Sequence, residues 1–299
     1  MTIQKQKHTP VLLNETLDLL QLKSGTNVID CTIGAGGHAA KILERTAPTG
    51  RLLGLDLDEA TLEMARRNLD RFHSRVMLVR ANYRNIEQVL LSTSFGSFQA
   101  ALLDLGFSSI EIDDPSRGFS LKFDGPLDMR FDLDQELTAA AIINSSSLEE
   151  LIRIFVEYGE ECEARNIAKA IVTLRREERI VGAARLAEIV KEAVSPRRRR
   201  GRIHPATQIF QALRIATNNE LGNIKTVLPV LFDRLDRGGR IAVITFHSLE
   251  DRIVKRFFKE KVKSEQATAI TRKPLVPTDE EIKNNNRSRS AKLRVIEKI

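Results

Sequence analysis

The stretch VIDCTIGAGGH, from Val28 to His38, constrains the fold of this chain more than any other. Its first residues read as the end of a buried strand, which stops at Asp30, and a glycine-rich turn follows at once. Glycines leave the backbone bare, so such a turn lets a ligand approach main-chain atoms closely. The stretch therefore predicts a strand, a ligand-binding turn and a helix, which together begin a parallel α/β sheet.

Strand and helix patterns alternate up to residue 107. Residues 51–58, 75–82 and 98–106 read as the second, third and fourth strands, and the second and fourth have an acid at or near their ends. Between the second and the third, residues 58–72 have the spacing of an amphipathic helix, with Asp58 as its N-cap. This alternation is typical of βαβ units, and strand patterns return at residues 238–247 and in a last edge strand, KLRVIEK, near the end of the chain.

The segment between these strand patterns differs in kind. It opens with a long irregular stretch to about Asp134, and residues 138–194 then read as helices throughout. We therefore expect an α/β fold in which an all-helical domain of residues 108–207 is inserted into a sheet domain of residues 1–107 and 208–299. The insertion follows the fourth strand at the carboxyl edge of the sheet, where open α/β folds bind ligands.

Two ligands fit the glycine turn. Its G-x-G-x-x-A spacing is that of dinucleotide sites, and Asp56 follows at the distance of a ribose-binding acid. Asp30 and Asp104 end strands that would face one crevice, where two carboxylates would repel a pyrophosphate but attract the cationic S-adenosylmethionine. The charges favour the methyl donor, although Asp30 can also act only as a turn cap. A nucleoside triphosphate loop is excluded because no Lys-Ser or Lys-Thr pair follows the glycines.

The chain is basic, with a formal net charge of +7 and a pI of about 9.5. A basic balance favours a polyanionic partner, above all nucleic acid, although a soluble enzyme can also simply be basic. The densest positive cluster comprises Arg197, Arg198, Arg199, Arg200 and Arg202. It suits the phosphates of folded RNA, or it is a solvated linker.

Other features exclude several classes of protein. Two cysteines, Cys31 and Cys162, give no disulfide framework and fit a reducing cytoplasm. The five histidines do not pair with the cysteines at metal-ligand spacing, so we expect no metal. No stretch approaches the ~20 apolar residues of a membrane span, so we expect no membrane partner.

Six blocks of sequence appear together and in order along the chain. They are HTPVLLNE (8–15), LLDLGFSS (102–109), RGFSLKFDGPLDMRFD (117–132), HPATQIFQALRI (204–215), FHSLEDRIVKRFF (246–258) and RSAKLRVIEK (289–298). With these blocks the sequence closely resembles the bacterial small-subunit (16S) ribosomal RNA cytosine-N4 methyltransferase family over nearly its whole length.

The resemblance implies a Rossmann-like class I methyltransferase sheet with a helical insertion, and S-adenosyl-L-methionine as the donor. It implies that the substrate is a cytidine in the decoding region of small-subunit rRNA, met in the RNA or in the small ribosomal subunit. By motif match, the donor contacts are Gly36, Gly37, His38, Asp56, Tyr83 and Asp104. A further contact that is usually glutamine falls here on Glu111, which can accept a hydrogen bond but lacks the amide donor.

The exocyclic amine of cytosine needs alignment with the methyl group and a hydrogen-bond acceptor. Asp104 is the candidate catalytic residue for that contact, or it serves only the donor. Methylation at C5 would need a cysteine nucleophile, and neither cysteine suits that role. His247, at the end of the fifth strand, is expected to pack and to orient the helix cap Ser248 rather than to catalyse. Three functions remain: an rRNA methyltransferase, a nicotinamide oxidoreductase, and an RNA-binding ribosome-assembly factor with a vestigial donor site.

Overall fold

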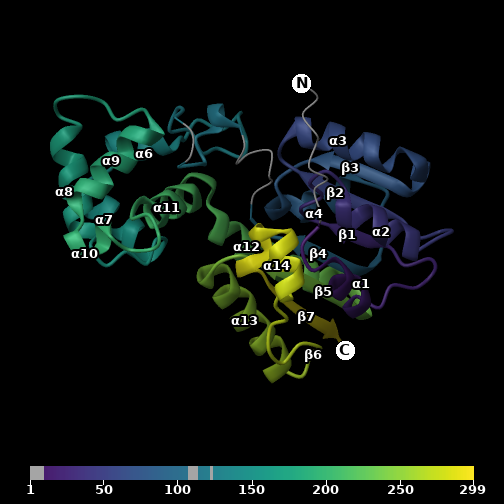
Figure 1. The fold of residues 1–299 in the computed structure, drawn as a ribbon. Coiled ribbons are helices and arrows are strands. Elements are labelled where there is room, and N and C mark those ends of the chain that lie inside the picture. Colours follow the sequence, from purple (N-terminus) through teal and green to yellow (C-terminus); the bar gives the residue numbers. More distant parts are fainter. Residues whose placement is uncertain (1–9, 107–113, 122–123) are drawn as a thin grey trace. The chain divides into compact units, whose positions relative to one another are not determined.

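The computed structural model describes residues 10–106, 114–121 and 124–299 of the 299-residue chain (Figure 1). The chain divides into two compact units. The sheet unit comprises Met1–Gly106 and Leu221–Ile299, and the helical unit comprises Phe107–Glu220. No helix within the described ranges combines the length and the apolar character needed to cross a membrane.

Seven strands form one sheet in the order β3-β2-β1-β4-β5-β7-β6. They are β1 (Val28–Asp30), β2 (Leu52–Asp56), β3 (Val76–Arg80), β4 (Phe98–Asp104), β5 (Leu235–Thr245), β6 (Ala267–Ala269) and β7 (Lys292–Lys298). The strands β1 to β5 pair in parallel, and β7 pairs antiparallel with both β5 and β6. The strand order changes direction between β1 and β4, and such a switch point opens a ligand crevice at the carboxyl ends of the strands.

Helices cover both faces of this sheet. The unit contains α1 (Leu13–Leu19), α2 (Gly37–Arg45), α3 (Glu59–Leu69), η1 (Asp70–Arg75), η2 (Tyr83–Asn85), α4 (Ile86–Ser92), α12 (Glu220–Arg234, from its second residue), α13 (Ser248–Lys263), α14 (Asp279–Asn284) and η4 (Asn286–Ser290). Helices α1 to α3 share one apolar core with Val28 and Leu102, whereas α4, α12 and α13 share another with Ile29 and Leu103. Consecutive strand residues point to opposite faces, so the continuous apolar runs belong to a sheet buried on both sides.

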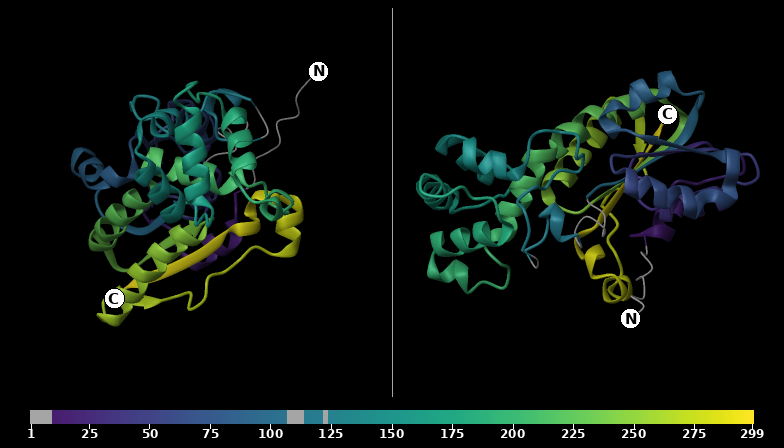
Figure 2. Two further views of the ribbon diagram at one scale, coloured as in Figure 1. Left: turned by 90° about the vertical axis from the view of Figure 1, so that its left-hand side faces the viewer. Right: turned by 90° about the horizontal axis from the view of Figure 1, so that it is seen from above.

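The last predicted strand is present as β7, but it is not an edge strand. Figure 2 shows it in yellow near the C-terminus, and it pairs with β5 on one side and with β6 on the other. The short strand β6 therefore forms the edge, with Thr268 opposite Glu297. Three residues are too few to give a recognisable alternation of apolar and polar positions, which is why the sequence did not reveal β6.

The helical unit has a core of its own. Its elements are η3 (Pro115–Arg117), α6 (Ala139–Ser145), α7 (Leu148–Glu157), α8 (Ala164–Leu174), α9 (Ala183–Ala193), α10 (Pro196–Arg199) and α11 (Ala206–Asn218). Phe155, Ile171 and Leu186 lie at the centre of this core, and α11 adds Leu213 to it. The packing of α11 explains why the compact unit extends to Glu220, beyond the boundary at residue 207 that the sequence suggested.

Candidate active site

The ends of β1 and β4 lie side by side at the switch point of the sheet. Asp30 pairs in register with Leu102, and Asp104 ends β4 two residues further on. The N–H of Asp104 donates to Oγ1 of Thr32, 2.7 Å away in the turn after β1. The two strand-end carboxylates are therefore neighbours, which is the arrangement that the charge argument required.

The glycine turn after β1 presents open backbone at the start of α2. Gly34 and Gly36 have φ values of 52° and 86°, in the left-handed region that side chains disfavour. Gly36 is the N-cap of α2 and Gly37 is its first residue. A Cβ on Gly37 would lie 2.5 Å from Cγ of Pro10, so only glycine fits where the N-terminal segment passes over the turn.

Asp56, at the end of β2, ties this turn to the neighbouring strand. Its Oδ2 accepts from the N–H of Gly34 at 3.1 Å, and its Oδ1 accepts from the N–H of Asp58 at 3.0 Å. Burial raises the pKa of Asp56 to about 6, although these N–H groups act in the opposite direction. Each oxygen keeps a second lone pair, so the carboxylate can still accept from a ribose diol. Asp58 caps α3 by accepting from Thr61, as predicted.

The carboxylates at these strand ends disfavour one another's charge. Burial raises the pKa of Asp30 to about 7; the N–H of Thr32 lowers it, and the charge of Asp56 raises it. Burial, and then the charges of Asp30 and Glu250, raise the pKa of Asp104 well above its usual range. Asp30 also accepts from the N–H of Thr32 at 3.2 Å, so it acts as a turn cap as well as a member of the acidic group. A cation bound here would relieve the repulsion.

Asp104 presents its two oxygens to different surroundings. Its Oδ2 lies 3.7 Å from Nδ1 of His38, whose side chain is 7% exposed. Its Oδ1 is enclosed and has no hydrogen-bond partner within the described part of the chain. Buried polar atoms are nearly always hydrogen-bonded, so this oxygen marks a place where the N–H of a ligand fits.

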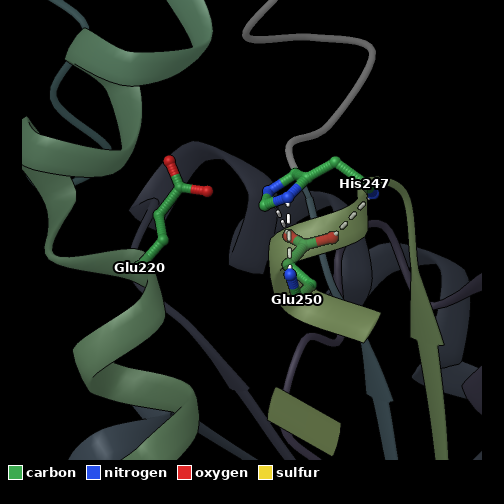
Figure 3. A group of neighbouring side chains, drawn as sticks. All are labelled: Glu220, His247 and Glu250. Atoms are coloured by element: carbon green, nitrogen blue, oxygen red, sulfur yellow. Dashed lines mark hydrogen bonds and ion pairs between the residues drawn. The ribbon is translucent and has the colours of Figure 1, made fainter. Parts of the chain in front are cut away.

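His247 and Glu250 form a capping box at the start of α13 (Figure 3). Nδ1 of His247 accepts from the N–H of Glu250 at 3.4 Å, and its Nε2 lies 3.2 Å from Oε1 of Glu250. Oε2 of Glu250 accepts from the N–H groups of Phe246 and His247. The predicted cap, Ser248, is instead the first residue of α13, and His247 itself is the N-cap. Glu220, also drawn, belongs to the helical unit, where Nε of Arg214 lies 2.8 Å from its Oε1.

The two remaining predicted contacts with the methyl donor are Tyr83 and Glu111. Tyr83 opens η2 just after β3 and is half-buried. The N–H of Ala81 donates to the main-chain oxygen of Asp56 at 3.0 Å, so Tyr83 follows a segment that is fastened to the end of β2. Glu111 lies outside the described residues. Asp56 and Asp104 thus end the two strands that flank β1, and Tyr83 follows β3 in the chain.

The strand order of the sheet, with its antiparallel seventh strand inserted beside β5, is that of the class I methyltransferases. The chain belongs to the MraW methylase family, whose sequence profile matches residues 5–299. Membership confirms the expected fold and methyl-transfer chemistry, and with it S-adenosylmethionine rather than a nicotinamide dinucleotide as the cofactor.

The similarity to known proteins covers 98% of the chain. The ribosomal RNA small subunit methyltransferase H of Carboxydothermus hydrogenoformans is 45% identical over 307 residues and is matched over 98% of both chains. The protein of the same name from Desulfosudis oleivorans is 44% identical over 309 residues, which cover 98% of this chain and 99% of that protein. The match to the structure of an rRNA methylase from Streptococcus thermophilus covers 98% of this chain and 99% of that chain, with a TM-score of 0.46 and 13% identity.

Proposed function

We propose that this protein transfers the methyl group of S-adenosylmethionine to the exocyclic N4 of a cytidine in the decoding region of small-subunit rRNA. The observation that carries the proposal is the carboxylate of Asp104 at the switch point, whose Oδ1 is buried and lacks a hydrogen-bond partner among the described residues. An amine N–H suits that oxygen. The names of the relatives, which are small-subunit rRNA methyltransferases, support the choice of RNA.

The residues around the glycine turn fit the donor. Asp56 would accept from the ribose hydroxyls, Tyr83 would pack beside the adenine, and the backbone of residues 36–38 would lie against the donor. Asp30 and Asp104 would face its ammonium and sulfonium charges. When bound, the donor supplies an electrophilic methyl group whose leaving group is a neutral thioether.

The amine of cytosine is a poor nucleophile because its lone pair is delocalised into the ring. Oδ1 of Asp104 would accept one N–H, aim the amine at the methyl group and receive the released proton. Since burial raises the pKa of Asp104, its carboxylate is a stronger base than that of an ordinary aspartate.

Other groups near the crevice suit this role less well. Nδ1 of His247 accepts from the N–H of Glu250 in the capping box, while its Nε2 lies 3.2 Å from Oε1 of Glu250 without a hydrogen bond among the described residues, so we assign His247 to the helix cap rather than to proton transfer. Burial, and then the charge of Asp30, raises the pKa of the Cys31 thiol, which disfavours the thiolate that C5 methylation would require. These observations support reaction at N4.

The arginine cluster of the helical unit offers contacts for RNA phosphates. Arg197, Arg200 and Arg202 are exposed, and within the described ranges their side chains form no hydrogen bond or ion pair. We propose that these three side chains bind the rRNA backbone, and that the inserted domain of residues 108–207 selects the substrate. A substrate of this kind would place the enzyme in the cytoplasm.

The proposal is tested by mass spectrometry of small-subunit rRNA nucleosides from cells with and without the gene. We expect N4-methylated cytidine to be lost with the gene and to be restored when purified protein and donor are added to the unmethylated subunits. Methylation at C5 instead would contradict the assignment of N4. Binding to the subunits without any methyl transfer would identify an assembly factor and would overturn the proposal.

A further inference from the structure

A short segment at the beginning of the described chain, residues 10–12, lies against the first turn of α2. We refer to it as the N-terminal strap. A Cβ on Gly37 would approach Cγ of Pro10 to 2.5 Å, so the proline ring packs on the bare glycine. The next residue, Val11, has its carbonyl oxygen 3.1 Å from Nε2 of His38. The strap therefore contacts both Gly37 and His38 of the candidate donor site.

The last residue of the strap, Leu12, has a backbone conformation that needs support. Its φ and ψ are 51° and 37°, in the left-handed region, and its side chain is completely buried. Residues other than glycine adopt this region at an energetic cost, which the surrounding structure must offset. The N–H of Leu12 donates to Oε1 of Glu281 at 2.8 Å, although the two residues are 269 positions apart.

Glu281 is itself held firmly at the start of α14. It is the third residue of that helix, and its N–H donates to Oγ1 of the N-cap Thr278 at 3.2 Å. Glu281 is half-buried, so water competes less for the hydrogen bond between its carboxylate and Leu12 than it would at an exposed side chain. A helix near the C-terminus thus fixes the backbone of a strap near the N-terminus.

The contact with Val11 determines which nitrogen of His38 carries a proton. A carbonyl oxygen can only accept, so Nε2 must be the protonated nitrogen. The neutral ring then has its lone pair on Nδ1, and this nitrogen lies 3.7 Å from Oδ2 of Asp104. When Nδ1 also takes a proton, His38 carries a positive charge beside that carboxylate.

We propose that Glu281 is a positioning residue for the donor site, which acts through the strap and His38 on Asp104. By holding Leu12, Glu281 keeps the Val11 carbonyl on Nε2 of His38, and this contact turns Nδ1 toward Asp104. With a proton on Nδ1 or on Oδ2, the fixed imidazole engages Oδ2, so Oδ1 stays directed to the substrate. The inference rests on the proposed function for its kinetic consequences, but the state of His38 can be observed without any reaction.

The charges around Asp104 explain why the orientation of His38 matters. Asp30 at the end of β1 and Glu250 in α13 both raise the pKa of Asp104, as does burial, which is the largest cause. His38, from α2, can provide the opposite charge at 3.7 Å. If the protonated form of His38 turns away, Asp104 loses this neighbouring positive charge and ionises less readily, and the rising limb of the rate against pH moves to higher pH.

Four variants separate the acceptor from the charge of residue 281. Glu281→Ala removes the acceptor, and Glu281→Asp keeps the charge on a shorter side chain that cannot reach Leu12. Glu281→Gln keeps an oxygen acceptor and removes the charge. Glu280→Ala is the matched control, because Glu280 is exposed in the same turn of α14 and has no hydrogen bond or ion pair among the described residues.

The first measurement is the tautomer of His38 in the donor-free protein, observed by NMR with isotope-labelled histidine and assigned with His38→Asn. We expect a proton fixed on Nε2 in the parent chain, in Glu281→Gln and in Glu280→Ala. We expect Glu281→Ala and Glu281→Asp to show a mixture of tautomers. Calorimetry should show donor affinity reduced about tenfold in those two variants, because Asp104 then ionises less readily and one charge-assisted interaction with the donor is weakened.

The second measurement is the pH profile of the single-turnover rate at saturating donor. We expect its rising limb to move to higher pH in Glu281→Ala and Glu281→Asp, and to stay in place in the other two variants. An unchanged His38 tautomer in Glu281→Ala and Glu281→Asp would overturn the inference, as would a loss in Glu280→Ala equal to that in Glu281→Ala. If the His38 tautomer changes as expected in Glu281→Ala and Glu281→Asp but the parent protein transfers no methyl group, the result would count against the proposed function alone.

Discussion

The two oxygens of Asp104 have separable tasks, because Oδ2 faces His38 and Oδ1 is left for a ligand. We expect Asp104→Asn to lower the single-turnover rate on small subunits, at saturating donor, by about 10²-fold or more. Asparagine keeps the shape of the side chain, but its amide N–H group faces either the amine of cytosine or the cationic S-adenosylmethionine, and neither accepts a hydrogen bond there. Its free energy of unfolding should not fall, since burial disfavours the charge that the substitution removes.

The dependence of the Asp104→Asn rate on the concentration of S-adenosylmethionine distinguishes the two roles of Asp104. A rate that returns to the parent value at saturating donor would assign Asp104 to donor binding only. A rate that stays low at saturation places the loss in the transition state. A parent-like rate at every donor concentration would show that the contact with the amine lies elsewhere.

The position of Asp56 at the end of β2 leads to a second prediction at this scale. Asp56→Ala should weaken the donor about tenfold or more, because charge-assisted hydrogen bonds to the ribose are removed and Gly34 loses its acceptor. Isothermal calorimetry measures the effect. Asp58→Asn is the control, since asparagine still caps α3 and the charge is removed from the same strand end. Equal donor affinities of Asp56→Ala and the parent would exclude Asp56 from the site.

The strand patterns were sufficient to point to Asp56 and Asp104, because these residues end strands, whereas His38, at the start of α2, was expected only through the family resemblance. Thr32 and Glu250 were missed. The hydroxyl of Thr32 meets the N–H of Asp104 across 72 positions, and nothing local marks such a pairing. Glu250 reads as an ordinary acid in the first turn of a helix, although a capping residue followed three positions later by glutamate would have been a usable signal.

At the scale of elements, the arginine cluster separates into structural and exposed members around α10. We expect the triple variant Arg197→Ser, Arg200→Ser, Arg202→Ser to weaken RNA binding and to reduce its log–log salt slope by about 0.7–0.9 for each phosphate that the variant no longer neutralises. Donor affinity should be unchanged, because these residues belong to the helical unit. Filter binding over a salt series measures the slope, and an unchanged slope would identify the cluster as a solvated linker.

Arg198, in the same cluster, is part of the fold. Its guanidinium lies 3.1 Å from Oε2 of the buried Glu161 and also contacts Gln208. We expect Arg198→Ser to destabilise the helical unit by about 3 kcal/mol, because a buried carboxylate loses its partner. Urea unfolding followed by hydrogen exchange of α7 and α8 measures this effect. Arg200→Ser is the control, and equal stability of the two variants would contradict a structural role for Arg198.

The sequence predicted most helices and strands, but it could not place the breaks that tertiary contacts impose. Residues 207–235 read in the sequence as one long helical stretch, whereas the structure has two helices, α11 and α12, separated at Asn219, whose φ is 48°. Asparagine tolerates the left-handed region, so the signal was present but weak. The inner position of β7 depends on pairing with β6, which no local pattern specifies.

At the scale of the whole molecule, the order of the strands was expected only through the family resemblance, whereas the concentration of acids at one edge was readable from strand ends. That concentration links stability to pH. The pKa of Asp30 is raised to about 7, far above the ordinary range of an aspartate, and burial is the largest cause. A group of this kind contributes stability that is fully present below its unfolded pKa and is lost as the pH rises through its folded pKa.

We therefore expect the donor-free sheet unit to lose about 2–3 kcal/mol of unfolding free energy between about pH 5 and pH 8 through Asp30 alone. Asp104 acts in the same direction. Asp30→Asn should flatten this dependence and be the more stable protein at the higher pH, since its amide oxygen can still accept from Thr32. Urea titrations followed by hydrogen exchange of β1 and β4 read this unit separately from the helical unit. The donor cation should bind the ionised carboxylates more tightly, so its affinity should rise with pH in the parent and less steeply in Asp30→Asn. Identical pH dependences of stability in the two proteins would mean that Asp30 ionises as it does in the unfolded chain. The strand-end carboxylates would then not repel one another in a way that the donor cation relieves.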